Sequence, residues 1–343
     1  MTYEEVLQKA AEVLKPKCRV CPECNGVACR GEVPGVGAIG DGSAFTLCRD
    51  YLSRIRLQMD AVHPHFDADT SLEMFGIQLA GPVMVAPIGG MPFNYTNVLT
   101  ETEYCEAVVF GAKEAGIIAF TGDGPLDDYF PSTLPVIASA GGLGIPTIKP
   151  WAKEKLFDRI DDISKIDCPA FAMDIDSAAL VNLKLQGKPA FAKSEEEIRE
   201  IVEAAQCPFI VKGVMTPESA LRCARAGAYA IVVSSHGGRI MQDTLPPVSV
   251  LSEIKDAVGD QMKIIVDGGI RSGSDVFKCL ALGADAVLIG RPYAIAAHGG
   301  GAEGVALYTE KILQELKEVM LMTDSPTLSD ITKDKIRFYP VVG

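Results

Sequence analysis

Long apolar runs and an excess of positive charge are both missing from this sequence of 343 residues. No stretch reaches the roughly 18–20 consecutive apolar residues that a membrane-spanning helix requires. The formal net charge is −13, which argues against a nucleic-acid-binding protein, because such proteins present a basic surface. The first stretch, MTYEEVLQKAAEVLKPK, predicts a charged amphipathic helix rather than a signal peptide. We therefore expect a cytoplasmic protein, and disulfides are rare in that compartment.

Two further absences bear on the fold. No G-x-G-x-x-G turn follows the first predicted strand, which argues against the doubly wound sheet of dinucleotide-binding proteins. No low-complexity linker divides the chain, which predicts one domain overall. What the sequence does contain, after residue 80, is an alternation of short β-rich runs and amphipathic helical stretches. The β-rich runs are 81–90, 116–124, 146–151, 169–176, 208–214, 229–238, 263–269 and 285–292.

Helix start signals separate these runs. Ser194 and Glu197 have the spacing of a capping box. Thr216 is a candidate N-cap with a proline at the first helical position, and Ser272 or Ser274 is a candidate N-cap further on. Eight strand–helix units predict the α/β class and a (β/α)8 TIM barrel. We expect residues 81–343 to form this barrel and residues 1–80 to be a cysteine-containing N-terminal extension that covers one end of it.

Polar side chains stand where the predicted strands end. Catalytic groups of such barrels lie at the carboxyl ends of the strands. The polar residues at these ends are Asp123, Lys149, Asp174, Asp176, Lys212, Ser234, His236, Arg239, Asp267 and Arg291. We therefore expect a functional site at this end of the barrel.

The last two strand ends have the features of a phosphate site. DGGIRSG (267–273) and IGRP (289–292) combine glycines with Arg271 and Arg291. Glycines let backbone N–H groups approach a phosphate, a helix N-terminus favours its charge, and arginine pairs with it. Ordinary tight turns are the alternative for each motif alone, but both follow the strands where barrels usually bind phosphate.

The stretch SSHGGR (234–239) predicts acid–base chemistry. His236 follows a buried strand and suits a general base near neutral pH. Arg239 offers a planar fork for a carboxylate. Lys212 emerges from the apolar stretch PFIV, and a buried lysine is usually paired with an anion. The structural alternatives are a core histidine for His236 and an ion pair of Lys212 with Asp174 or Asp176.

Five motifs together resemble one family, the FMN-dependent 2-hydroxy acid dehydrogenases and oxidases, which include glycolate and lactate oxidases. The motifs are APIGG, VKGVMTPESA, SSHGGR, DGGIRSGSDVFKCLALGA and VLIGRP. The resemblance implies a flavin-binding barrel in which His236 removes a substrate proton, Arg239 binds the substrate carboxylate and Lys212 lies beside the flavin. It also implies that Asp176 pairs with His236. The cofactor-binding residues that it implies are Pro87, Ile88, Gly89, Thr121, Lys149, Asp174, Lys212, Ser234, Asp267, Gly268, Gly269, Arg271, Gly290 and Arg291.

The sequence departs from the family pattern around the substrate. Lys149 stands where the family usually has a glutamine, Trp151 where it has a tyrosine and Asp174 where it has a threonine. A second carboxylate-binding arginine is missing from DIDSAALVNLKLQGK, and the N-terminal substrate tyrosine has no counterpart. Tyr95 and Trp151 are tentative replacements in a rebuilt substrate pocket.

The resemblance implies oxidation of a 2-hydroxy acid to a 2-oxo acid by a homotetramer, with an open choice of electron acceptor. One alternative is a non-redox FMN barrel similar to type 2 isopentenyl diphosphate isomerase. Another is a non-catalytic protein that binds flavin or metal.

Four of the ten cysteines are crowded into a short stretch before the barrel. Cys18, Cys21, Cys24 and Cys29 have the spacing C-x2-C-x2-C-x4-C, and Cys48 is a candidate fifth thiol. Four thiolates are enough for zinc or for an iron–sulfur cluster. A reduced, metal-free loop that shapes the pocket is the third alternative.

Overall fold

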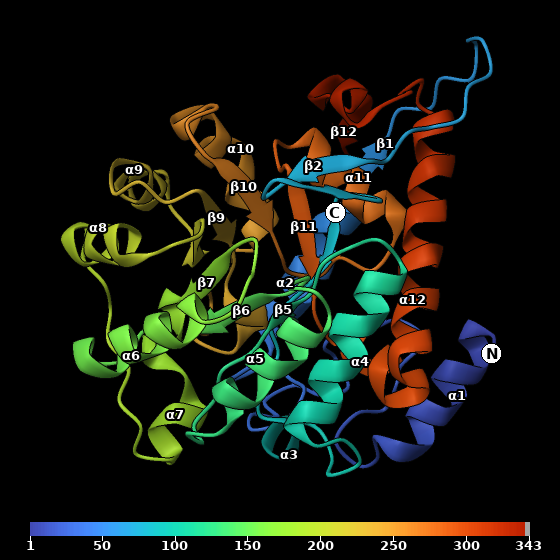
Figure 1. Ribbon diagram of the computed structural model, residues 1–343. Coiled ribbons are helices and arrows are strands. Elements are labelled where there is room, and N and C mark those ends of the chain that lie inside the picture. The colour runs from blue at the N-terminus through green and yellow to red at the C-terminus, as the bar shows by residue number, and fades with distance from the viewer. Residues whose placement is uncertain (340–343) are drawn as a thin grey trace.

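Eight parallel strands form a closed barrel in the computed structural model, which describes residues 1–339 (Figure 1). The barrel is closed by a parallel bridge between Val85 and Ala119, which joins the first and last strands of the sheet. In barrel order the strands are β4 (Val83–Val85), β11 (Ala286–Ile289), β10 (Lys263–Val266), β9 (Ala230–Val233), β8 (Phe209–Val214), β7 (Phe171–Asp174), β6 (Ile145–Ile148) and β5 (Phe120–Thr121). Each predicted β-rich run overlaps one of them, which confirms the (β/α)8 barrel. The last four residues of the predicted barrel segment, 340–343, lie outside the described residues.

Side chains alternate along each strand between two apolar layers, one inside the barrel and one between the barrel and its helices. In β9, Ala230 and Val232 belong to the cluster that fills the barrel, whereas Ile231 and Val233 belong to the cluster under the helices. This is the period of two that a strand imposes on its side chains. Both faces are covered, so the strands are apolar throughout, as expected for a parallel sheet.

The helices around the barrel begin where the capping signals indicate. Ser194 and Glu197 form a capping box, Thr216 accepts the N–H of Ser219, and Ser272 rather than Ser274 caps its helix. The helices that cover the strands are α4 (Glu101–Glu114), α5 (Tyr129–Ser139), α6 (Lys153–Ser164), α8 (Glu195–Ala204), α9 (Pro217–Arg225), α10 (Pro247–Val258), α11 (Gly273–Ala281) and α12 (Arg291–Leu321). No helix of residues 1–339 combines the length and the apolar character needed to cross a bilayer.

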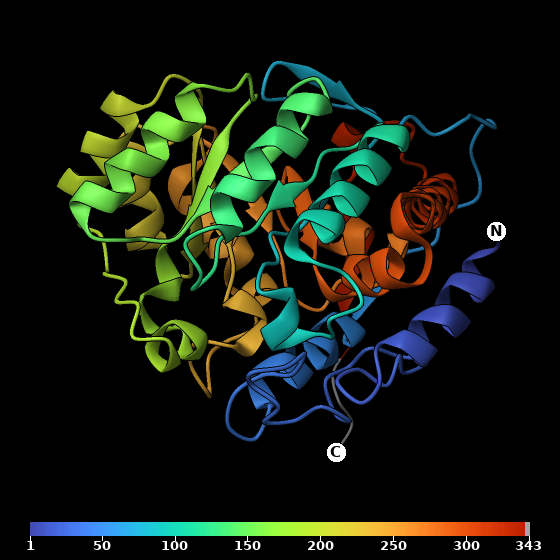
Figure 2. The same cartoon turned by 60° about the horizontal axis from the view of Figure 1, so that its bottom comes forward.

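The segment before β4 is in contact with both ends of the barrel, whereas the sequence indicated one. Helix α1 (Tyr3–Val13) packs on α12, and the dark blue chain that follows it, with α2 (Ser43–Ser53), runs beside the barrel end that faces forward in Figure 2. The hairpin of β2 (Leu72–Met74) and β3 (Ile77–Leu79) fills the other end, because its apolar side chains join the inner cluster. Strand β1 (Ile55–Leu57) pairs with β12 (Ile336–Phe338).

Candidate active site

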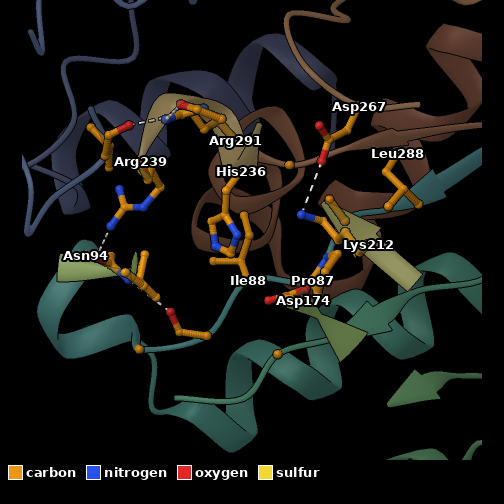
Figure 3. A pocket seen from close by; sticks show the side chains of 18 of the residues that line it. Pro87, Ile88, Asn94, Asp174, Lys212, His236, Arg239, Asp267, Leu288 and Arg291 are labelled. Carbon is orange, nitrogen blue, oxygen red and sulfur yellow. Dashed lines mark hydrogen bonds and ion pairs between the residues drawn. The ribbon is translucent and has the colours of Figure 1, made fainter. Parts of the chain in front are cut away.

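A large cavity opens at the carboxyl ends of the strands (Figure 3). The structure brings most of the predicted site residues to its wall. Those that line it are Pro87, Ile88, Gly89, Tyr95, Lys149, Asp174, Lys212, His236, Arg239, Asp267, Gly268, Gly269, Arg271, Gly290 and Arg291. Their shared position follows from the parallel barrel, in which all strands end on one side.

His236 is held in a constrained conformation just beyond β9. Its φ of 54° is in the left-handed region, which non-glycine residues seldom adopt. Its backbone N–H donates to Ser234 Oγ at 3.1 Å, and its Nδ1 lies 2.9 Å from Asp176 Oδ1. Burial, together with the positive charges of Lys212 and Lys149, lowers the pKa of His236 well below its usual value. The imidazole is therefore neutral at pH 7, and donation from Nδ1–H leaves a lone pair on Nε2.

A β-bulge in β8, directly after Lys212, brings the strand close to Asp176. The pairing with β9 shifts register between Lys212 and Val214. Gly213, in the bulge, has φ of 105°, and a Cβ there would lie 2.6 Å from Asp176 Cγ. Only glycine allows this approach, and bulges near active sites commonly redirect side chains in this way.

Lys212 is buried among acceptors and stays positively charged. Its Nζ donates to Ser234 Oγ at 3.0 Å and lies 3.6 Å from Asp267 Oδ2. Burial alone would lower the pKa of Lys212, but the carboxylates of Asp267, Asp176 and Asp174 outweigh it and raise this pKa. The partner in the ion pair is thus Asp267, whereas the sequence indicated Asp174 or Asp176.

Lys149 and Asp174, two departures from the family pattern, form a buried ion pair. Their Nζ and Oδ2 atoms are 2.5 Å apart. Burial alone would raise the pKa of Asp174, but the charges of Lys149 and Lys212 reverse this effect and lower it. The two unusual residues therefore compensate each other, since an unpaired buried charge is costly.

Arg239 is bonded to Asn94, which is bonded in turn to Asn182, and the sequence patterns predicted neither asparagine. Its Nη2 donates to Asn94 Oδ1 at 2.7 Å, and Asn182 Nδ2 donates to the same oxygen at 2.9 Å. Both asparagines line the cavity. Asn182 lies in the segment 174–188, which lacks the second arginine of the family pattern. That missing arginine was the one sequence feature that pointed to this region. Burial, and then the charge of Arg291, lowers the pKa of Arg239 to about 10.

The arginines of the predicted phosphate site contact the N-terminal segment. Arg271 Nε donates to the carbonyl of Cys24 at 3.0 Å, and Arg291 Nε donates to the carbonyl of Val36 at 2.6 Å. Carbonyl groups satisfy these donors without neutralising their charge. Within residues 1–339, no carboxylate lies within 4.0 Å of Arg239, Arg271 or Arg291. Three cations without carboxylate partners therefore border one cavity.

Comparison with known proteins agrees with this arrangement. Residues 178–338 match the family model of FMN-dependent dehydrogenases. The chain is 30% identical over 332 residues to the 4-hydroxymandelate oxidase of Amycolatopsis orientalis, covering 85% of this chain and 91% of that protein. The chain belongs to the family of FMN-dependent 2-hydroxy acid oxidases and dehydrogenases. Membership in this family confirms the predicted FMN-dependent oxidoreductase and favours it over the non-redox and non-catalytic alternatives.

Other members of this family show likeness of different extent. The L-lactate oxidase of Roseobacter sp. (strain GAI101) is 39% identical over 158 residues, which are 46% of this chain and 42% of that protein. The match therefore spans less than half the length of that relative. The crystal structure of mandelate oxidase has a TM-score of 0.82 with 23% identity, and 99% of each chain is covered. This likeness shows the fold.

Four predicted site residues do not line the cavity. Thr121 donates to Thr133 Oγ1, and the Trp151 indole donates to Asp123 Oδ2 at 2.7 Å. Trp151 is buried and does not line the cavity, although Asp123 does, so a substrate contact at Trp151 stays a prediction. Ser234 and Asp176 lie behind the wall, where they bond to Lys212 and His236.

The four clustered cysteines border a second, smaller cavity and not the large one. All of them are free thiols. No three His, Cys, Asp or Glu side chains of residues 1–339 are arranged to hold a metal ion. Cys48 lies apart from them, where its thiol donates to the carbonyl of Ala44.

The wall of the large cavity fits FMN. Oxygen atoms of Asp174, Asn182 and Asp267 are buried there with no hydrogen-bond partner in the described part of the chain. Such orphan acceptors are rare in folded proteins and indicate a polar ligand. Together with Arg271 and Arg291, which have no carboxylate partner, they match a ligand with an anionic group and a polar ring system.

Proposed function

We propose that the protein oxidises a 2-hydroxy acid to its 2-oxo acid. The observation that carries this proposal is the His236–Asp176 pair, in which His236 lines the same cavity as Arg239 and Lys212 while Asp176 supports it from behind the wall. A neutral base, a carboxylate-binding arginine and a buried cation are the groups that this reaction needs. The cytoplasmic location and the homotetramer expected from the sequence remain predictions. Light scattering can test the homotetramer.

FMN would be held by the loop 87–89, by Lys212 and Asp267, and by Arg271 and Arg291 at its phosphate. When bound, FMN supplies the acceptor for two electrons. Lys212 would favour negative charge near the ring, because a fixed buried cation stabilises charge strongly where water is excluded.

His236 takes a proton from the substrate at Nε2. Its lowered pKa keeps the ring neutral, and Asp176 stabilises the imidazolium that forms. Arg239 would bind the substrate carboxylate through its guanidinium fork. Substrate and base are thereby held in one orientation, which lowers the entropy cost of the step.

We infer that the side chain of the substrate lies against Tyr95, Asn94 and Asn182. These residues line the cavity beside Arg239. Two amides and a tyrosine make a more polar surface than an aliphatic pocket, so we expect a substrate that carries a polar group beyond its hydroxyl.

Anaerobic titration of the FMN-loaded protein with a panel of 2-hydroxy acids tests the function. We expect at least one acid to bleach the flavin absorbance, and His236→Ala to keep its flavin but bleach very slowly. Exposed His65 provides a control, since His65→Ala should bleach as the natural protein does. Rapid bleaching of the His236→Ala protein would contradict the role of this residue.

A further inference from the structure

Four cysteines surround one small cavity in the N-terminal segment. Cys18, Cys21, Cys24 and Cys29 all line it, and none is in a disulfide. Most of the remaining wall is apolar, with Val36, Tyr95 and Ile295 among its residues. Four free thiols around one enclosed space are a ligand set, because thiolates bind soft metal centres.

The described residues contain no arrangement of side chains that would hold a single metal ion. Zinc lies about 2.3 Å from each thiolate, which requires sulfur atoms only about 4 Å apart. No group of this kind is found in residues 1–339. A cluster of several iron and sulfide ions instead places its cysteines around a larger volume, and four cysteines are its usual ligands.

Donors to sulfur are already in place. The N–H of Val20 donates to Cys18 Sγ at 3.4 Å, and Arg271 Nη2 lies 3.6 Å from Cys24 Sγ. Arg291 lines the same cavity. Hydrogen bonds and positive charge near the sulfur atoms stabilise an anionic cluster and set its reduction potential.

The cysteine cavity shares a wall with the flavin cavity. Val36, Tyr95 and Arg291 line both of them, so one layer of side chains separates the two spaces. A redox centre in the smaller cavity would therefore be a neighbour of the flavin.

We propose that Cys18, Cys21, Cys24 and Cys29 hold an iron–sulfur cluster that conducts electrons away from the flavin. The conducting role rests on the proposed function, whereas the cluster site does not. Oxidation of one hydroxy acid releases two electrons and two protons. The cluster passes the electrons singly to an external one-electron carrier, and the protons go to water.

The cluster is tested by anaerobic reconstitution of the FMN-loaded protein with ferrous iron and sulfide. We expect bound iron and acid-labile sulfide in the natural protein, and an electron paramagnetic resonance signal after reduction with dithionite. Cys24→Ser and Cys29→Ser should lose both and keep FMN. Cys207→Ser is the matched control, since Cys207 is also a partly exposed free thiol. The cluster proposal would be overturned if the natural protein bound no iron and sulfide, if Cys24→Ser bound as much iron as the natural protein, or if the cysteines held only zinc.

Conduction is tested by photoreduction of the bound flavin, which needs no substrate. We expect the cluster signal to appear as the flavin bleaches, and a cluster that stays oxidised would overturn the conducting role. With an active hydroxy acid, Cys24→Ser should bleach normally yet reduce a one-electron carrier protein about tenfold more slowly or worse. If no hydroxy acid bleaches the flavin, the proposed function fails while the cluster result stands.

Discussion

The Nδ1 atom of His236 lies 2.9 Å from Oδ1 of Asp176, although 60 positions separate them in the sequence. Asp176 follows β7 and His236 follows β9, and β8 carries Lys212 between them. The strand order of the barrel thus creates the pair. Because Asp176 accepts the proton of Nδ1, Nε2 is left as the basic nitrogen.

Replacement of Asp176 tests this assignment. Asp176→Asn keeps the size of the side chain but presents an amide that can donate to Nδ1, so the imidazole proton moves to Nε2. We expect kcat to fall by roughly 10²–10⁴-fold, the range for loss of acid–base catalysis, with little change in KM. Steady-state kinetics measures this, and Asp161→Asn on the surface of α6 is the control. An unchanged kcat would show that the pair is only structural.

The depressed pKa of His236 predicts an acid-tolerant enzyme. A base works in its unprotonated form, so a lowered pKa keeps it active at lower pH. We expect the acid limb of kcat/KM to lie below pH 6.5, the usual value for histidine. The measurement is kcat/KM against pH with saturating FMN. A limb at or above 6.5 would contradict the prediction.

Lys149→Gln should move that limb to higher pH. The substitution removes a positive charge that lowers the pKa of His236 and leaves the carboxylate of Asp174 to raise it. Lys153→Gln, which alters an exposed ion pair with Glu200, should leave the limb in place. The same profile for all three proteins would mean that Lys149 does not act on the base.

The fold and the flavin end of the site could be predicted from sequence because their signals are local. Apolar runs between capping motifs mark the strands, and DGGIRSG and IGRP are contiguous. Strand order in a barrel then decides which ends meet. The prediction for Ser234 identified its neighbourhood but not its position behind the cavity wall.

The substrate end depends on contacts that a linear pattern does not contain. Asn94 is held to Asn182 and Arg239 by hydrogen bonds that join three distant segments. Trp151 follows β6 as expected, yet its indole donates to the carboxylate of Asp123 and is not part of the cavity wall. Tertiary hydrogen bonding, rather than position after a strand, decided these cases.

The hairpin that fills the far end of the barrel should contribute to stability alone. Phe75 is buried there, with its ring 5.5 Å from that of Tyr229. We expect Phe75→Ala to lower the free energy of unfolding by about 3–5 kcal/mol, as for other buried phenylalanines. Urea denaturation measures this, and Val62→Ala, at 95% exposure, should change it by less than about 0.5 kcal/mol. A large change in KM would instead connect the hairpin to the site.

Asn94 offers the sharpest test of the substrate end, because its oxygen is already 2.7 Å from the guanidinium of Arg239. Asn94→Asp changes the charge without changing the size, so its carboxylate would compete with that of the substrate. We expect KM to rise by about 10–100-fold, the equivalent of one charge-assisted hydrogen bond. Asn94→Ala removes the contact without adding a competitor and should raise KM less. If Asn94→Asp bound 2-hydroxy acids as tightly as the natural protein, Arg239 would not be the carboxylate site.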